Sequence, residues 1–357
     1  MEKAFTIRGD GAKGNQIEIE FQNRIFPGTV GKNRTWEVTL SGLKANAVNE
    51  DMIIREGPRE LTVKNLLVGE LWVFSGQSNM AFPLKNATGG KQAMKEIPQA
   101  PIRILRFDAP PTTISPFNEE HLEQLKNIGL YRFSWKEPTA KSLASFSAIA
   151  WWAGKEIQAR KGIPIGIICN AVGGTGTEAW LPARTLQKDA YRAIAGDRWL
   201  SSERISPWAR GRAKLNIGKH DTTLHPFKPS WCYENLMSSL RDIPIAGVVW
   251  YQGETNAEQN APAWNQQLIC DLISGWRRDL NQAELPFYLV QLPRIGGTDP
   301  MRQFWPEYRA SQAAAAKKMP CTKLAVTTDL GYDSPDVHPP DKRPVADRIV
   351  EVIFEER

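Results

Sequence analysis

From residue 67 onward, short apolar runs alternate with longer segments of helical period. The apolar runs lie at 71–75, 102–107, 163–169, 245–251, 287–292 and 324–328, and the helical segments at 144–160, 263–279, 304–318 and 342–355. This alternation is typical of parallel strands that are joined by crossover helices. The sequence therefore predicts a doubly wound α/β domain over residues 67–357, with a mostly parallel sheet flanked by helices.

The first 66 residues have a different pattern. Polar and apolar residues alternate in 16–21, 36–40 and 60–63, and glycine and asparagine separate these segments. A period of two residues between turn residues indicates antiparallel strands. We expect residues 1–66 to form a small β-rich accessory region.

Composition excludes several classes of protein. Of the 357 residues, 41% are hydrophobic, which is enough for a large core. The net charge of +6 is spread along the chain, so no nucleic-acid partner is expected. No apolar run reaches the roughly 18 residues of a membrane span, and the first four residues begin no apolar signal core. The four cysteines are scattered without the spacing of a metal site, so we expect no metal, and no feature specifies an oligomer.

Residues 186–230 lack a clear period and are rich in Arg, Lys and Trp. Connections of this length are often functional. The segment could cover a binding site and contribute to specificity, or it could be a disordered or merely decorative insertion. The sequence leaves these alternatives open.

Four polar or glycine-rich motifs follow predicted strands. They are Ser78 and the segments 171–177, 252–256 and 336–339. The carboxyl ends of parallel strands meet at one edge of a sheet, where open α/β folds bind their ligands. We therefore expect these distant motifs to form one site.

Ser78 and His338 are the residues that suggest nucleophilic catalysis. Ser78 follows an apolar strand and a turn at Gly76, so its hydroxyl can stand exposed at the sheet edge. His338 lies in a rigid loop before Pro339 and can take the hydroxyl proton. Their structural alternatives are a helix-capping serine and a capping or core histidine. Because the GxSxG motif is absent, an ordinary α/β-hydrolase is disfavoured.

A catalytic histidine needs a partner that fixes its tautomer. Asp336, Asp333 and Asp329 are all close to His338 in sequence, and Asp336 is our choice. Turn formation around Gly331 is the alternative role of the other two.

Acyl transfer also needs hydrogen-bond donors for a developing oxyanion. The expected donors are the backbone N–H groups of Ser78 and of the glycine pair that includes Gly174, together with the amide of Gln252. Thirteen tryptophans are many for this length, and indole rings stack well on sugars. We predict substrate contacts for Trp180, Asn79 and Glu254, although Asn79 can instead tie its own loop and Glu254 can bond within the site.

These motifs together resemble the SGNH hydrolases, and among them the sialate O-acetylesterase family of carbohydrate esterases. The matching blocks are VGELW at 68–72, GQSNM at 76–80, AVGGT at 171–175, VWYQGETNA at 249–257 and DVHP at 336–339. The resemblance implies a flavodoxin-like fold and a serine hydrolase that removes acetyl groups from sugar hydroxyls without a metal or cofactor. It also implies that Ser78 is the nucleophile, that His338 is the base, and that Gly174 and Gln252 complete the oxyanion hole.

The resemblance further implies an acetylated carbohydrate as substrate and an extracytoplasmic setting. The wider superfamily usually places Asp three residues before His, where Pro335 stands here. A Ser–His dyad oriented by a backbone carbonyl is therefore an alternative to the triad. A noncatalytic sugar-binding module on an esterase fold is the alternative function. A nucleotide site at 173–176 is disfavoured because the GK[ST] ending of a phosphate loop is absent.

Overall fold

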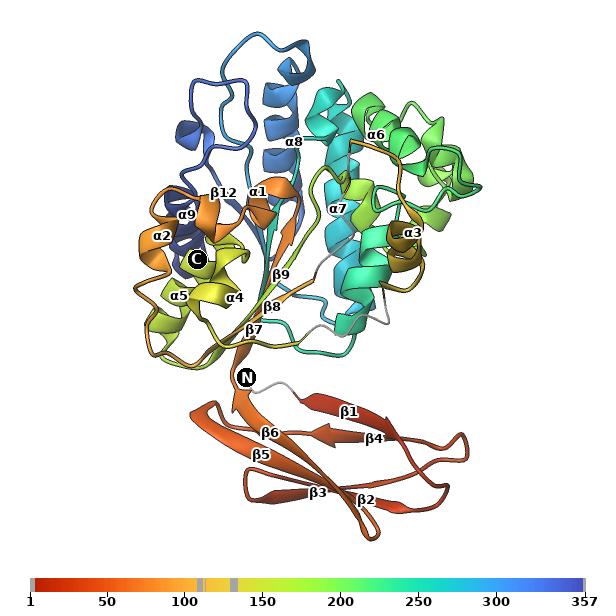
Figure 1. Cartoon of the computed structure of the whole chain (residues 1–357), viewed down its shortest axis with the longest axis vertical. Coiled ribbons are helices and arrows are strands. Elements are labelled where there is room, and N and C mark those ends of the chain that lie inside the picture. The colour runs from red at the N-terminus through yellow and green to blue at the C-terminus, as the bar shows by residue number, and fades with distance from the viewer. Residues whose placement is uncertain (1–3, 108–111, 113, 129–133, 356–357) are drawn as a thin grey trace.

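The computed structural model describes residues 4–107, 112, 114–128 and 134–355 (Figure 1). The expectation that the first four residues begin no signal core falls partly on residues 1–3, which lie outside the described residues. The chain forms an α/β body, drawn in the upper part of the figure, and an antiparallel β region below it.

A six-stranded sheet forms the centre of the α/β body. Its strand order is β12-β11-β10-β7-β9-β8, and every pairing is parallel. The strands are β7 (Glu70–Gly76), β8 (Ile102–Arg106), β9 (Ile165–Ala171), β10 (Gly247–Tyr251), β11 (Phe287–Val290) and β12 (Thr322–Ala325). The expected α/β class with a parallel sheet is confirmed.

The strand order places a reversal of direction beside β7. From β7 the chain builds β8 and β9 on one side, then crosses to build β10, β11 and β12 on the other. The ends of three strands meet there, because Gly76 is paired with Ala171 of β9 and with Tyr251 of β10. Such a reversal opens a crevice at the carboxyl edge of the sheet.

Helices cover both faces of the sheet (Figure 1). On one face α5 (Ala148–Lys161) packs against α9 (Arg343–Phe354), and on the other α7 (Pro262–Asp279) packs against α8 (Trp305–Lys318). Strands that are covered on both faces are apolar throughout, as in β10, where all five residues are buried.

Local chemistry sets several element boundaries that differ from the expected ones. Helix α5 begins at Ala148 rather than at 144, because the Ser147 hydroxyl accepts the Ala150 N–H at 3.0 Å and caps the helix. Strand β9 begins at Ile165, directly after Pro164, which has no N–H to give to a neighbouring strand.

Shorter helices connect these elements. The α-helices are α1 (Ser78–Ala81), α2 (Gly90–Ala93), α3 (Glu119–Lys126), α4 (Ala140–Ala144) and α6 (Pro207–Ile217). The 3₁₀ turns are η1 (Leu84–Asn86), η3 (Thr177–Trp180), η4 (Thr185–Gln187), η5 (Asp189–Tyr191), η6 (Gly196–Leu200), η8 (Ser238–Leu240), η9 (Asn256–Glu258), η10 (Pro300–Arg302) and η11 (Thr328–Leu330), and η7 (Tyr233–Met237) is a π turn.

The segment 186–230 is ordered and belongs to the body of the fold. Tyr191, Ile194 and Trp199 are fully buried in the main core, and α6 lies within the segment. A disordered insertion is therefore excluded.

The N-terminal β region has two antiparallel sheets. Strand β1 (Phe5–Asp10) pairs with β4 (Thr35–Leu40), and β2 (Gln16–Phe21), β3 (Arg24–Thr29), β5 (Asn46–Glu56) and β6 (Arg59–Val68) are arranged in the order β3-β2-β5-β6. The alternating residues of β2 and β4 point into a separate core that contains Ile17, Ile19, Val38 and Leu40. The period of two residues thus predicted this region correctly.

Candidate active site

Ser78 stands on the turn that follows the central strand β7. The strand ends at Gly76, whose φ of +138° is one that residues with a side chain rarely adopt. A Cβ at Gly76 would lie 1.9 Å from the backbone oxygen of Tyr251 in β10. Only glycine therefore fits here, and the tight approach places Ser78 as the first residue of α1. An N–H in the first turn of a helix has no acceptor within that helix, and among the described residues the Ser78 N–H has no other backbone acceptor.

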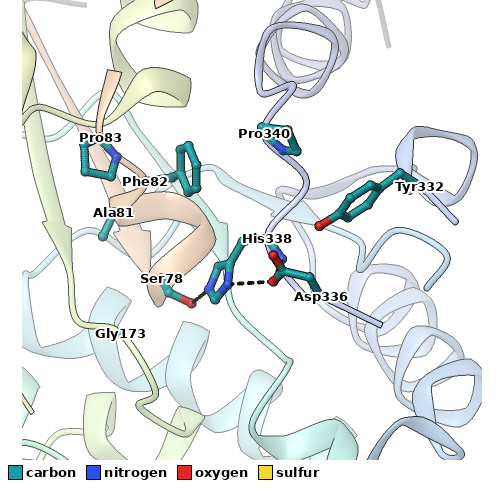
Figure 2. A pocket seen from close by; sticks show the side chains of 9 residues that line it. All are labelled: Ser78, Ala81, Phe82, Pro83, Gly173, Tyr332, Asp336, His338 and Pro340. Carbon is teal, nitrogen blue, oxygen red and sulfur yellow. Dashed lines mark hydrogen bonds and ion pairs between the residues drawn. The ribbon is translucent and has the colours of Figure 1, made fainter. Parts of the chain in front are cut away.

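His338 and Asp336 meet Ser78 from a loop near the far end of the chain (Figure 2). The Ser78 Oγ lies 2.8 Å from Nε2 of His338, and the Nδ1 of His338 lies 3.2 Å from Oδ1 of Asp336. A carboxylate only accepts hydrogen bonds, so Nδ1 carries the proton and Nε2 is left to accept the serine hydroxyl. This geometry allows the Ser78 hydroxyl to give its proton to Nε2 of His338, while Asp336 holds the imidazole ring.

Of the three candidate acids, the structure brings Asp336 to the histidine. Its Oδ1 also accepts the backbone N–H of His338 at 3.0 Å. Asp329 instead forms an ion pair with Arg348 at 3.1 Å. Partial burial raises the pKa of Asp336, but the backbone N–H of His338, the imidazole charge and the Tyr332 hydroxyl lower it more, so it stays below its usual value.

A pocket of about 690 Å³ opens above these side chains. Figure 2 shows Phe82 and Pro83 on one side of the pocket and Tyr332 on the other, with Ser78 and His338 below them in the view. The complete lining consists of Ser78, Ala81, Phe82, Pro83, Gly173, Tyr332, Asp336, His338 and Pro340. The site therefore offers aromatic and proline surfaces around a reactive hydroxyl.

The glycine pair after β9 lies beside Ser78. Gly173 lines the pocket, and a Cβ placed on it would be 3.5 Å from the Cβ of Ser78. Gly174 has a φ of +78°, and a Cβ there would come within 2.7 Å of Trp208 in α6 and of Phe227. Among the described residues, the N–H of Gly174 has no hydrogen-bond acceptor. Because Trp208 comes so close to Gly174, the segment 186–230 packs on this glycine loop.

The structure places Gln252, the expected side-chain donor to an oxyanion, behind the pocket. Its side chain is fully buried and is not part of the pocket lining. Its Nε2 is taken up by Gln77 Oε1 at 3.2 Å, Thr175 O at 3.2 Å and Asn256 Oδ1 at 2.7 Å. An amide with two hydrogens and three protein acceptors has no free donor, so Gln252 holds the loops together instead.

The structure also places Trp180, Asn79 and Glu254, for which substrate contacts were expected, outside the pocket lining. Trp180 is fully buried, and its indole N–H donates to Thr175 Oγ1 at 2.9 Å. Asn79 is 1% exposed and Glu254 is 3% exposed, and neither lines the pocket. All three side chains turn toward the interior.

Asn79, Glu254 and Lys342 form a buried polar cluster behind the site. Asn79 Nδ2 donates to Glu254 Oε1 and, at 2.8 Å, to the backbone oxygen of Val337. Asn79 Oδ1 accepts from Lys342 Nζ. Burial raises the pKa of Glu254, and the Asn79 hydrogen bond and the charges of His338 and Lys342 limit the rise.

Sequence reasoning did not single out Phe82, Tyr332 or Lys342. Phe82 and Tyr332 are each four residues from an expected catalytic residue, a spacing that in retrospect was the one available signal. Lys342 resembles an ordinary surface lysine in the sequence, and only the fold places it inside.

No cluster of three or more His, Cys, Asp or Glu side chains within the described ranges could hold a metal ion. In the same part of the chain, no helix combines the length and apolarity needed to span a bilayer.

The fold and the site together define an α/β protein that brings a serine, a histidine and an aspartate together at the carboxyl edge of its parallel sheet. Residues 200–344 match the family model described as carbohydrate esterase, sialic acid-specific acetylesterase. The chain is 30% identical to the sialate O-acetylesterase of Homo sapiens over 342 residues, which cover 88% of this chain and 59% of that protein. The Rattus norvegicus sialate O-acetylesterase is also 30% identical, with 89% of this chain and 62% of that protein covered.

A solved structure agrees with these sequence matches. The crystal structure of a carbohydrate acetylesterase from Xanthomonas citri superposes with a TM-score of 0.77 at 26% identity, covering 99% of this chain and 72% of that one. The chain is therefore a relative of the sialate O-acetylesterases, and the resemblance found in the sequence is confirmed. It spans about three-fifths of the length of the curated relatives.

Proposed function

We propose that this chain is a serine esterase that hydrolyses O-acetyl esters of carbohydrates. The observation that carries the proposal is the hydrogen-bonded series from Ser78 through His338 to Asp336 inside an open pocket. The names of the relatives, sialate O-acetylesterase and carbohydrate acetylesterase, support the same reaction and the same substrate class.

In the proposed acylation step, Ser78 Oγ attacks the acetyl carbonyl carbon while its proton passes to Nε2 of His338. Asp336 keeps Nδ1 protonated and stabilises the imidazolium that forms. The imidazolium then gives its proton to the sugar oxygen as the ester bond breaks. The sugar leaves with a free hydroxyl, and the acetyl group stays on Ser78.

Deacylation repeats these roles with water. His338 takes a proton from the water molecule, the resulting oxygen attacks the acetyl-serine, and the imidazolium returns the proton to Ser78 Oγ. Acetate is released and the enzyme is restored. The same pair of side chains therefore serves both half-reactions.

The proposed oxyanion hole consists of the backbone N–H groups of Ser78 and Gly174. The first belongs to the first turn of α1, and the second has no protein acceptor among the described residues. Removal of one such donor typically costs about a hundred- to a thousandfold in rate. Gln252 supports this hole indirectly, because its amide binds the backbone oxygen of Thr175, next to Gly174.

We also propose that the aromatic walls of the pocket bind the sugar. Phe82 and Tyr332 lie on opposite sides of the pocket (Figure 2), and aromatic faces pack well against the C–H faces of sugar rings. Residues 67–357 would then be the catalytic domain. Residues 1–66, whose core is separate, would be an accessory region.

The deciding experiment is the hydrolysis of para-nitrophenyl acetate and of O-acetylated sugars, with and without EDTA. We expect activity in the wild type that EDTA does not change and that the Ser78→Ala and His338→Ala variants lose. A folded wild type that binds acetylated sugars but hydrolyses neither type of ester would overturn the proposal in favour of a noncatalytic binding module.

A further inference from the structure

Asn79 connects the two loops that carry the proposed catalytic pair. It directly follows Ser78, and its Nδ2 donates at 2.8 Å to the backbone oxygen of Val337, which directly precedes His338. One amide therefore spans the gap between the nucleophile turn and the histidine loop, one residue away from each reactive side chain.

The partners of this amide allow only one orientation. The Lys342 ammonium group can only donate, and it reaches Asn79 Oδ1. The backbone oxygen of Val337 can only accept, as can the carboxylate of Glu254 when it is ionised. A flipped amide would set its NH₂ against the Lys342 ammonium and its oxygen against the backbone oxygen of Val337. The ammonium of Lys342 therefore fixes the orientation in which Asn79 donates to the histidine loop.

The position of Lys342 is unfavourable for a lysine. Its side chain is only 1% exposed, and it occupies the N-cap position of α9, where the helix dipole disfavours a positive charge. Its Nζ lies 4.9 Å from the ring centre of Phe82, a wall of the pocket, so the charge is placed just behind the site. Burial and the helix dipole both disfavour the charge of Lys342, so we expect its contacts to give this charge a function.

The charged groups that face Lys342 come from two segments, the loop after β10 and the histidine loop. They are Glu254 after β10, Asp336 in the histidine loop and the neighbouring Asp341. Burial lowers the pKa of Lys342 to about 8, and these three carboxylates limit the fall. At neutral pH the side chain is thus a protonated donor opposite Glu254.

We propose that Lys342 is a positioning residue of the esterase site, which holds Asn79 so that the Ser78 turn and the His338 loop keep their hydrogen-bonded geometry. The inference rests on the proposed function and adds to it a residue that does not touch the substrate. Its effect passes from Lys342 Nζ to Asn79 and from Asn79 Nδ2 to Val337. Glu254 accepts from the same amide and balances the charge.

The experiment compares Lys342→Met with Arg343→Met in the full chain. Methionine matches the length of the lysine stem but has no donor. Arg343 directly follows Lys342 and is the first residue of α9. It is exposed and pairs with Asp347 at 2.8 Å, so its substitution removes an equal charge away from the site. With para-nitrophenyl acetate we expect K342M to lose about 10- to 100-fold in kcat, with KM within twofold, because small misplacements of reacting groups have costs of this size. R343M should match the wild type.

A double-mutant cycle tests the route through Asn79. Asn79→Ala alone should lower kcat as much as K342M does, and K342M should lower it by less than about twofold further in the Asn79→Ala background. Effects that multiply fully, or a folded K342M with kcat within twofold of the wild type, would overturn the proposal. Circular dichroism establishes folding. If K342M does not fold, Asn79→Ala decides, because an unchanged kcat in that variant removes the route.

A second measurement separates this inference from the esterase proposal. The ¹⁵N chemical shifts of the His338 ring, assigned with His338→Ala, report its hydrogen bonds without turnover. K342M should move these shifts and R343M should not. An inactive wild type refutes the esterase function, and the ring shifts alone then decide the positioning role. Unchanged shifts in K342M contradict it.

Discussion

Gly76→Ala is the substitution for which the structure gives the clearest expectation. Gly76 ends β7 two residues before Ser78, with φ at +138° and no room for a side chain. The added Cβ would lie 1.9 Å from the backbone oxygen of Tyr251, whereas a Cβ contact below 3.0 Å is essentially never seen. That oxygen belongs to β10, which is buried in the middle of the sheet and cannot rotate away.

The magnitude follows from this overlap. Relief of the clash requires the end of β7 to move by about 1.1 Å from β10, the difference between 3.0 and 1.9 Å. Ser78 moves with it, while His338 is held by another loop. A displacement of about 1 Å between reacting groups can cost about a hundredfold in rate. The unfavourable φ adds about 1–3 kcal/mol of destabilisation.

The assay is kcat for para-nitrophenyl acetate, together with the free energy of unfolding from urea titration. Gly162→Ala is the matched control, because Gly162 also has a positive φ, of +66°, but a Cβ there meets nothing within 4 Å. We expect G76A to lose about a hundredfold in kcat and G162A to keep it, although both variants lose stability. If folded G76A turned over ester within threefold of the wild type, the tight turn would not be what places Ser78.

Three further predictions follow from the site. Asp336→Asn should lower kcat at neutral pH by about 10- to 1,000-fold, since an amide donor facing Nδ1 favours the wrong tautomer; a rate equal to that of the wild type would favour a Ser–His dyad. Trp180→Phe should lower the free energy of unfolding by about 1–3 kcal/mol and leave KM for an acetylated sugar unchanged, whereas Tyr332→Ala should raise KM. The reverse pattern in titration calorimetry and kinetics would contradict the assignment of Tyr332 to the wall of the pocket. The pKa of Lys342 is about 8 in the folded chain and 10.5 in the unfolded chain, so between these pH values the folded state binds fewer protons than the unfolded state. The free energy of unfolding of the wild type, measured with urea from pH 8 to 10.5, should therefore rise by up to about 3 kcal/mol relative to that of K342M. A difference that does not change with pH would refute the burial of this charge.

The sequence alone determined the layout of the fold and singled out Ser78 and His338, which the structure brings together. The period of its apolar residues predicted the parallel sheet, because strands covered on both faces must be apolar throughout. It also predicted that the loops after β7, β9 and β10 would meet, since parallel strands put their carboxyl ends at one edge, and Gly76 is indeed paired with Ala171 and Tyr251. Ser78 and His338 were therefore expected together before any distance was known.

Only the tertiary structure decided which polar side chains face the pocket. Gln252, Glu254 and Trp180 stand in the expected loops but turn inward, because the direction of a side chain in an irregular loop depends on contacts with other segments. The choice of Asp336 over Asp329 likewise depended on Arg348 of α9, which forms an ion pair with Asp329. Lys342 gave no sign in the sequence, since a lysine before a helix is ordinarily solvated. Sequence periodicity records which residues leave water, whereas the partner of a buried polar group is fixed only when distant segments pack together.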